Sequence, residues 1–311
     1  MGLWGWILFA VPVLAMLVLD LRAASGGGGK DPTLRSAALW TSAWIGLALV
    51  FGLAVYVLHG GEAAVAYLTA YVVEESLSID NIFVFVLIFS ELRTPAAQQR
   101  KVLYWGIVGA VFLRAILIAS GMYLLDRFQW ITYVFAAVIV LAAARIVFAK
   151  EQERRAVVKA CAVCDSWVAR FVPITPVLHD GRFIVRQGGR WVATPLLIAL
   201  VVVETTDFVF ALDSIPAAFA ISRVPFLVYT SNVFAMLGLR SLYFVLGGAV
   251  QRLRYLRAGL AIILAFVGAK MLLAEVVPIP TWVSLAVIAA ALGGAVIASV
   301  AVERRPSLAR P

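Results

Sequence analysis

Nine apolar segments, each close to the length that crosses a bilayer, dominate this chain. They lie near residues 3–20, 39–58, 64–90, 102–125, 129–149, 194–215, 226–249, 257–275 and 281–302. Lipid leaves no partner for open backbone groups, so segments of about 20 apolar residues are expected to be helices. Of the 311 residues, 63% are hydrophobic and 14% charged, which excludes an ordinary soluble domain. The sequence therefore predicts an all-α, polytopic membrane protein with about nine transmembrane helices.

Basic residues assign the loops to the two sides of the membrane. Lys and Arg follow the first, third, fifth and seventh predicted spans and also end the chain, whereas the intervening loops hold few of them. Because basic loops stay in the cytoplasm, the N-terminus is expected outside and the C-terminus inside. This topology explains the net charge of +9, and nucleic acid is not an expected partner.

The spans and loops divide the chain into five regions. Residues 1–35 hold the first helix and a cytoplasmic linker, 36–149 hold helices two to five, 150–193 form a cytoplasmic loop, 194–280 hold helices six to eight, and 281–311 hold the last helix and a cytoplasmic tail. Within the long loop, RFIVRQGGRWVA predicts a β-hairpin that turns at Gly188 and Gly189.

An acidic motif occurs in two of the predicted spans. In the third span Glu74 is followed six residues later by Asp80, and in the sixth span Asp207 is followed six residues later by Asp213. Arg114 and Arg240 occupy matching places in the spans that follow, each seven residues before a glycine. Spans three to five therefore repeat as spans six to eight. Because three is odd, the second copy is inverted, which is typical of secondary transporters with a site near the midplane.

Spans three and six together carry more acids than the nearby bases can balance. The acids are Glu74, Glu75, Asp80, Glu204, Asp207 and Asp213. Arg114 and Arg240 lie in mid-span, whereas Arg145 and Lys270 lie close to span ends. Each carboxylate at the bilayer centre costs about 2.5–3.5 kcal/mol on insertion scales. The surplus of negative charge favours a cation site, and the alternative is purely structural pairing with these bases.

Helical spacing groups the candidate ligands. Glu74, Ser78 and Asn81 share one face of an ideal helix, and Glu204, Asp207 and Ser214 share another. Asp80 and Asp213 lie off these faces if the helices are regular. Pro216 removes a backbone donor, so we expect local unwinding of the sixth span that turns Asp213 inward.

The candidate ligands supply only oxygen atoms, which suit Mg²⁺, Ca²⁺ and Mn²⁺ better than Zn²⁺ or copper. The two histidines, His59 and His179, fall in loops. Buried carboxylates can also bind protons, so exchange of metal for protons is a hypothesis. Cys161 and Cys164 form one CxxC, which is compatible with reduced spectator thiols or with a regulatory site. No nucleophile–base or nucleotide motif is visible, so neither an enzyme nor a resident cofactor is expected.

The stretches ESLSIDNIFVF and ATPLLIALVVVETTDFVFALDSIPAAFAI resemble the TerC/Alx family of bacterial membrane proteins, in the wider LysE-like transporter group. The resemblance covers about residues 35–280. It implies an inner-membrane protein that exports Mn²⁺ from the cytoplasm, in a family that also carries tellurium-resistance names. The positions that match the family's acidic motifs are Glu74, Asp80, Asn81, Glu204, Asp207 and Asp213.

These observations predict a metal site of those six residues, supported by Glu75, Ser78 and Ser214, with Arg114 and Arg240 balancing charge when no metal is bound. Two alternatives remain. One is a membrane scaffold or sensor in a metal or tellurite resistance complex, for which the acids matter little. The other is a transporter that exchanges Ca²⁺.

Overall fold

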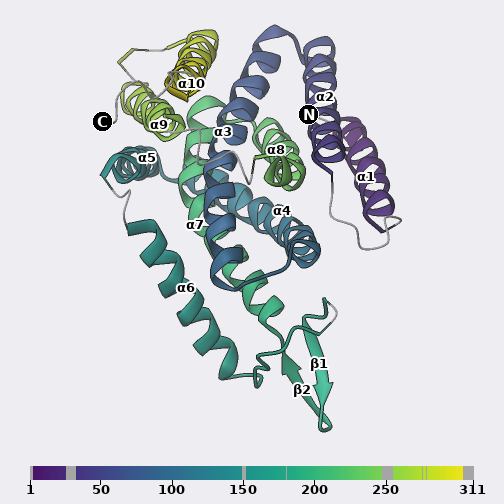
Figure 1. The fold of residues 1–311 in the computed structure, drawn as a ribbon. Coiled ribbons are helices and arrows are strands. Elements are labelled where there is room, and N and C mark those ends of the chain that lie inside the picture. The colour runs from purple at the N-terminus through teal and green to yellow at the C-terminus, as the bar shows by residue number, and fades with distance from the viewer. Residues whose placement is uncertain are drawn as a thin grey trace, which may run out of the picture.

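The computed structural model describes residues 3–25, 33–148, 152–179, 181–246, 255–274, 276–277 and 279–303. Within these residues the chain forms ten helices and one two-stranded hairpin (Figure 1). The helices are α1 Leu3–Ser25, α2 Leu34–His59, α3 Gly61–Glu91, α4 Ala96–Arg127, α5 Ile131–Phe148, α6 Gln152–Ala169, α7 Pro195–Ile221, α8 Pro225–Leu246, α9 Leu256–Leu272 and α10 Thr281–Glu303. The strands are β1 Ile184–Gln187 and β2 Arg190–Ala193.

Every predicted span coincides with a helix, which confirms the all-α class. Among the described residues, α2, α4, α7 and α10 are long and apolar enough to cross a membrane by length and composition. Helices α1 and α5 contain shorter apolar segments, Trp4–Leu19 and Ile131–Ile146. The total of nine spans and the inverted repeat stay predictions.

Helices α3 and α7 run through the middle of the molecule (Figure 1). Helix α3 packs against α8, and α7 packs against α4. Helices α1 and α2 cover one side, while α5, α9 and α10 lie on the other, with α5 packed along α9. Two central helices, each backed by a helix from the opposite half of the sequence, form the scaffold of the candidate site.

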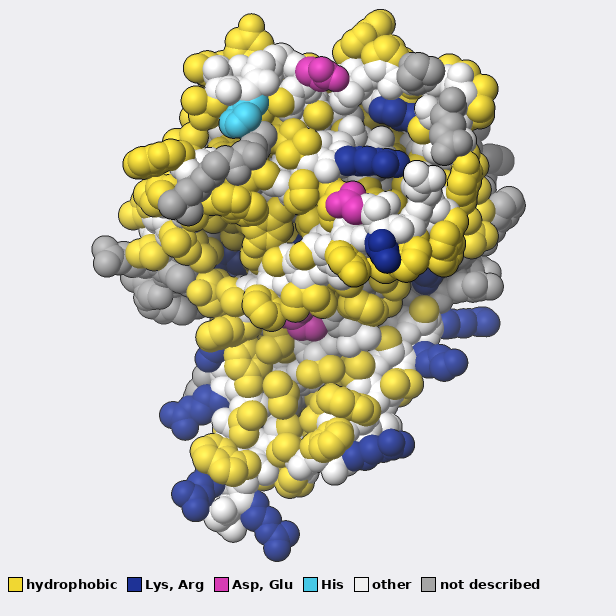
Figure 2. Space-filling model, turned by 180° about the vertical axis from the view of Figure 1, so that it is seen from behind, with side chains coloured by type: hydrophobic (Ala, Val, Ile, Leu, Met, Phe, Trp, Pro, Cys, Tyr) yellow, Lys and Arg dark blue, Asp and Glu magenta, His cyan; other side chains and the backbone are white. Residues whose placement is uncertain are grey.

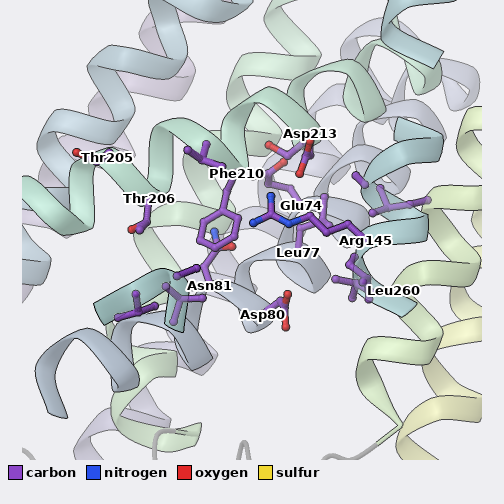
Figure 3. A pocket seen from close by; sticks show the side chains of 18 of the residues that line it. Glu74, Leu77, Asp80, Asn81, Arg145, Thr205, Thr206, Phe210, Asp213 and Leu260 are labelled. Carbon is purple, nitrogen blue, oxygen red and sulfur yellow. The ribbon is translucent and has the colours of Figure 1, made fainter. Parts of the chain in front are cut away.

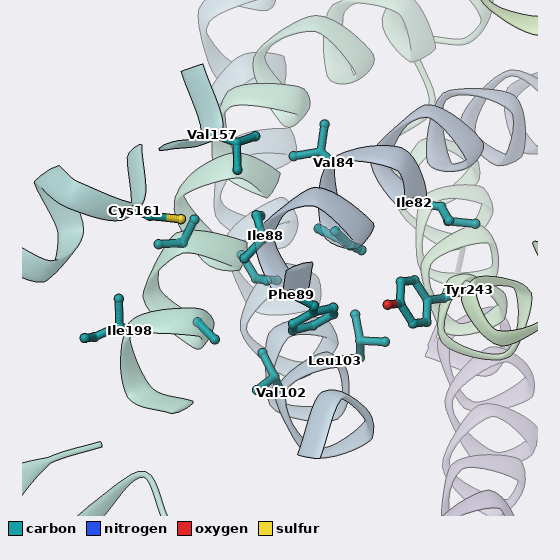
Figure 4. Close-up of a cluster of buried hydrophobic side chains, with 14 of the residues drawn as sticks. Ile82, Val84, Ile88, Phe89, Val102, Leu103, Val157, Cys161, Ile198 and Tyr243 are labelled. Carbon is teal, nitrogen blue, oxygen red and sulfur yellow. The ribbon is translucent and has the colours of Figure 1, made fainter. Parts of the chain in front are cut away.

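Helix α6 lies inside the region predicted as a cytoplasmic loop. Its buried residues Val157, Cys161, Cys164 and Val168 recur at helical spacing. This apolar face packs against α3 and α7, where Val157 and Cys161 join a cluster with Ile88 and other side chains (Figure 4). The amphipathic spacing was readable in the sequence, although only the packed structure shows which helices it covers.

The hairpin prediction is confirmed. Strands β1 and β2 pair antiparallel, with Gln187 opposite Arg190. Gly188 and Gly189 adopt φ of 56° and 80°, the left-handed conformation that a tight two-residue hairpin turn requires. In Figure 2, Lys and Arg side chains project around this lower extension, and its location on the cytoplasmic side stays a prediction.

The expected unwinding of the sixth span at Pro216 is wrong. Helix α7 continues without a break from Pro195 to Ile221. Proline removes one backbone hydrogen bond, but Pro216 and the three residues after it are buried against neighbouring helices. Tertiary packing therefore keeps the helix intact, since most helical stability in proteins comes from packing.

Candidate cation site

A cavity of about 240 Å³ is lined by residues of α3 and α7, together with residues of α4, α5, α6 and α9. Glu74 and Asp80 enter it from α3, and Asp213 enters it from α7 (Figure 3). Helices α3 and α7 are regular, so Asp80 and Asp213 do not share the helix faces that carry Glu74 and Asp207. Both residues nevertheless line the cavity. Helices α3 and α7 thus place three carboxylates in one cavity.

The other polar groups that line the cavity supply oxygen atoms or positive charge. The oxygen donors besides the carboxylates are Asn81, Thr205, Thr206 and Ser214, and the basic residues are Arg114 and Arg145. The described residues that line this cavity include no His, Cys or Met. Oxygen donors of this kind suit a hard cation, and binding of a cation here stays a prediction.

Arg114 is the centre of a buried polar cluster beside the cavity. Its side chain is 1% exposed, and its Nη1 donates hydrogen bonds to Glu74 Oε1 and Asn232 Oδ1, and to Ser214 Oγ at 3.3 Å. Its Nη2 lies 3.6 Å from Asp207 Oδ1. One guanidinium therefore connects α3, α7 and α8 and carries the positive charge between two buried carboxylates.

The two outer carboxylates of the cavity also face arginines. Arg257 Nε, at the start of α9, lies 3.3 Å from Asp80 Oδ1, and its guanidinium rests over the ring of Phe83. Arg145 extends from α5 into the cavity between Asp213 and Asp80 (Figure 3), and it attracts Asp213 electrostatically. Each cavity carboxylate thus has an arginine neighbour from another helix.

These contacts correct the charge balance inferred from the sequence. That inference treated Arg114 and Arg240 as the bases available to the acids, but Arg145 also lines the cavity, and Arg257 pairs with Asp80. In the described part of the chain no three His, Cys, Asp or Glu side chains gather closely enough to hold a metal ion. The surplus of negative charge is smaller than predicted, and arginines keep the acids separate in this conformation.

Three predicted residues of α7 and α8 lie outside the main cavity. Asp207 contacts Arg114 and lines a much smaller cavity together with Arg240. Glu204 packs against α4, where a β-carbon at Gly109 would collide with the Glu204 carboxyl group. Gly109 therefore allows the Glu204 carboxyl group to lie close to α4. Glu204 does not line the main cavity with Glu74, Asp80 and Asp213.

The supporting residues of α3 divide between two sides of that helix. Ser78 is buried with Glu74, but neither Ser78 nor Glu75 lines the main cavity. Glu75 points toward α8 near Gly238 and shares a hydrogen bond with Tyr71. Of the acidic pair, only Glu74 therefore faces the cavity.

Sequence reasoning did not identify Asn232 or Arg257 as part of the site. Asn232 is completely buried, and it lies in a Thr-Ser-Asn run of α8 whose polar character was the available signal. Arg257 sits at the predicted cytoplasmic end of a span, where basic residues are common, so nothing distinguished it.

Known proteins resemble this chain along most of its length. A family model described as "Integral membrane protein TerC family" matches residues 59–307. The chain is 44% identical to the membrane protein STKORF319 of Myxococcus xanthus, over 97% of this chain and 93% of the relative. It is 41% identical to the "Putative membrane-bound redox modulator Alx" of Escherichia coli K12, over 92% and 90%.

No solved structure matches the chain. The family match covers far more than half of its residues and includes both acidic motifs and the arginines that face them. The chain belongs to the TerC family of integral membrane proteins.

Proposed function

We propose that this protein exports hard divalent cations, with Mn²⁺ as the principal substrate, from the cytoplasm across the inner membrane. One observation carries the proposal: Glu74, Asp80 and Asp213 line a single cavity in a bundle of apolar helices. Charged residues inside membrane bundles are costly and commonly mark ion pathways. The remaining uncharged donors are amide and hydroxyl oxygens, which favour Mn²⁺, Ca²⁺ or Mg²⁺.

Two buried carboxylate oxygens support binding of a cation. Glu74 Oε2 and Asp207 Oδ2 have no hydrogen-bond partner among the described residues. A buried acceptor without a partner is costly, and a metal ion is one ligand that would satisfy it. The cation would compete with Arg114 for Glu74, so entry of the metal requires the contact between Arg114 and Glu74 to loosen, while Asp207 stays beside Arg114.

The direct test is uptake of Mn²⁺ into inside-out vesicles, in which export from the cytoplasm appears as accumulation. We expect saturable uptake that Ca²⁺ and Mg²⁺ inhibit more weakly than unlabelled Mn²⁺. A proton gradient is the proposed driving force, so a protonophore should reduce the uptake. Ca²⁺ accumulation in preference to Mn²⁺ would instead favour the Ca²⁺ exchanger. Absence of uptake at every imposed gradient, with intact protein, would favour a scaffold.

The name of the Escherichia coli relative raises redox chemistry as a second function, and the cysteines bear on it. Cys161 and Cys164 are free thiols on the buried face of α6, outside the predicted spans. Burial, together with the charge of Glu91, raises the pKa of the Cys161 thiol to about 11. Because the thiolate is the reactive form, this environment disfavours redox exchange at neutral pH.

We therefore expect Cys161 in the native protein to react slowly with iodoacetamide at pH 7.5. A pKa raised above the ordinary value near 9 leaves about a hundredfold less thiolate at this pH, and the rate should rise about tenfold per pH unit up to pH 10. Alkylation can be followed by mass spectrometry, with the unfolded protein in detergent as the control. Rapid labelling of the native protein at pH 7.5 would contradict this prediction and favour a redox role.

A further inference from the structure

Asn232 differs from the polar residues around it on α8. Thr230, Ser231 and Asn232 are all completely buried. Thr230 Oγ1 donates to Phe226 O at 2.7 Å and Ser231 Oγ donates to Val228 O at 3.0 Å, so both hydroxyls are satisfied within their own helix. Asn232 instead accepts a hydrogen bond from Arg114 of α4. Unlike Thr230 and Ser231, Asn232 therefore forms its side-chain hydrogen bond with a residue of another helix.

Among the described residues, only the oxygen end of the Asn232 amide has a hydrogen-bond partner. Asn232 Nδ2 is buried and has no hydrogen-bond partner among the described residues. An unsatisfied buried donor destabilises a protein, so the favourable contact of the Asn232 side chain is the one that its Oδ1 makes with Arg114. We therefore expect the role of Asn232 to lie in the hydrogen bond that its Oδ1 accepts from Arg114.

The contacts of Arg114 suggest what that function is. In the structure the guanidinium has two carboxylates nearby, Glu74 and Asp207, together with Asn232 and Ser214. When a cation takes Glu74, Arg114 keeps only one carboxylate. The Oδ1 of Asn232, which accepts a hydrogen bond from Arg114 Nη1, can then continue to hold the guanidinium.

We propose that Asn232 is a positioning residue that holds the Arg114 guanidinium when a cation occupies Glu74, and so sets the affinity of the site for divalent cations. This inference rests on the proposed function and deepens it. Asn232 does not line the main cavity and is not a metal ligand. It acts through Arg114, which would otherwise remain on Glu74 and compete with the metal.

The test compares two variants of similar size in the full-length protein. Asn232→Leu removes the acceptor, and Asn232→Asp keeps it. We expect Asn232→Leu to raise the Mn²⁺ concentration for half-maximal uptake about tenfold, the effect of one hydrogen bond to a charged group, with little change in maximal rate. Asn232→Asp should keep this concentration within about twofold of the wild type. Ser231→Ala is the matched control, because its hydroxyl bonds only to its own helix.

A packing role predicts the opposite order, because leucine is tolerated in an apolar core and a buried aspartate is not. Equal half-maximal concentrations for the wild type and Asn232→Leu, at normal abundance, would overturn the proposal. The Mn²⁺-dependent rise in Tm of the purified proteins gives a readout that does not need transport. A Tm rise in the wild type that Asn232→Leu lacks at the same Mn²⁺ concentration supports the inference even without uptake. If the wild type shows neither uptake nor a Tm rise, the proposed function and this inference both fail.

Discussion

Asp213→Asn and Asp80→Asn are each expected to abolish Mn²⁺ uptake by inside-out vesicles while leaving the protein in the membrane. Both acids line the main cavity, from α7 and α3 respectively. Asparagine has nearly the same shape as aspartate, so packing should survive, but the negative charge that attracts a divalent cation is lost. Both carboxylates also face arginines, and losing either one leaves positive charge uncompensated in the cavity. We therefore expect at least a hundredfold fall in initial rate, from roughly 3 kcal/mol or more of lost electrostatic stabilisation.

The measurement is the initial rate of Mn²⁺ uptake per amount of protein in the vesicles. Asp126→Asn is the matched control, because Asp126 is an exposed acid near the end of α4 and outside the cavity. It should transport at the wild-type rate. Normal uptake by Asp213→Asn would remove that residue from the site, and normal uptake by both cavity variants would remove the cavity from the pathway.

Arg114→Leu is expected to give the largest loss of stability of any single change considered. The substitution leaves the carboxylates of Glu74 and Asp207 buried without their shared cation. Removing one partner of a buried ion pair typically costs about 3–5 kcal/mol of the free energy of unfolding. Three helices, α3, α7 and α8, also lose their common hydrogen-bond donor.

Unfolding of the purified protein in detergent, followed by circular dichroism against temperature or denaturant, measures this effect. Arg127→Gln provides the control, because Arg127 is exposed at the end of the same helix. A triple variant, Arg114→Leu with Glu74→Gln and Asp207→Asn, should recover much of the lost stability, since it removes the buried charges as well. If Arg114→Leu unfolds with the wild-type free energy, the buried cluster does not hold these helices together.

The expected dependence on Arg114 also shows where sequence reasoning failed. Three of the acids that the sequence predicted as metal ligands, Glu74, Asp80 and Asp213, line one cavity, although their binding of a metal stays a prediction. Counting charges along the spans placed Arg145 near a span end and did not consider Arg257, yet Arg145 lines the cavity and Arg257 pairs with Asp80. Position along a span says how deep a residue can lie, but long arginine side chains extend their charge well away from the backbone.

The sequence by itself determined the elements of this protein. Apolar length and helical spacing predicted the helices of the bundle, and the Gly188–Gly189 pair predicted the hairpin, because these features depend on local backbone chemistry and on lipid as the solvent. Only the tertiary structure decided that α7 stays helical through Pro216, that α6 lines part of the cavity, and that Asn232 contacts Arg114. Those outcomes depend on contacts between residues far apart in the chain, such as Arg114 and Asn232, which are 118 positions apart. No local pattern specifies which helix faces meet.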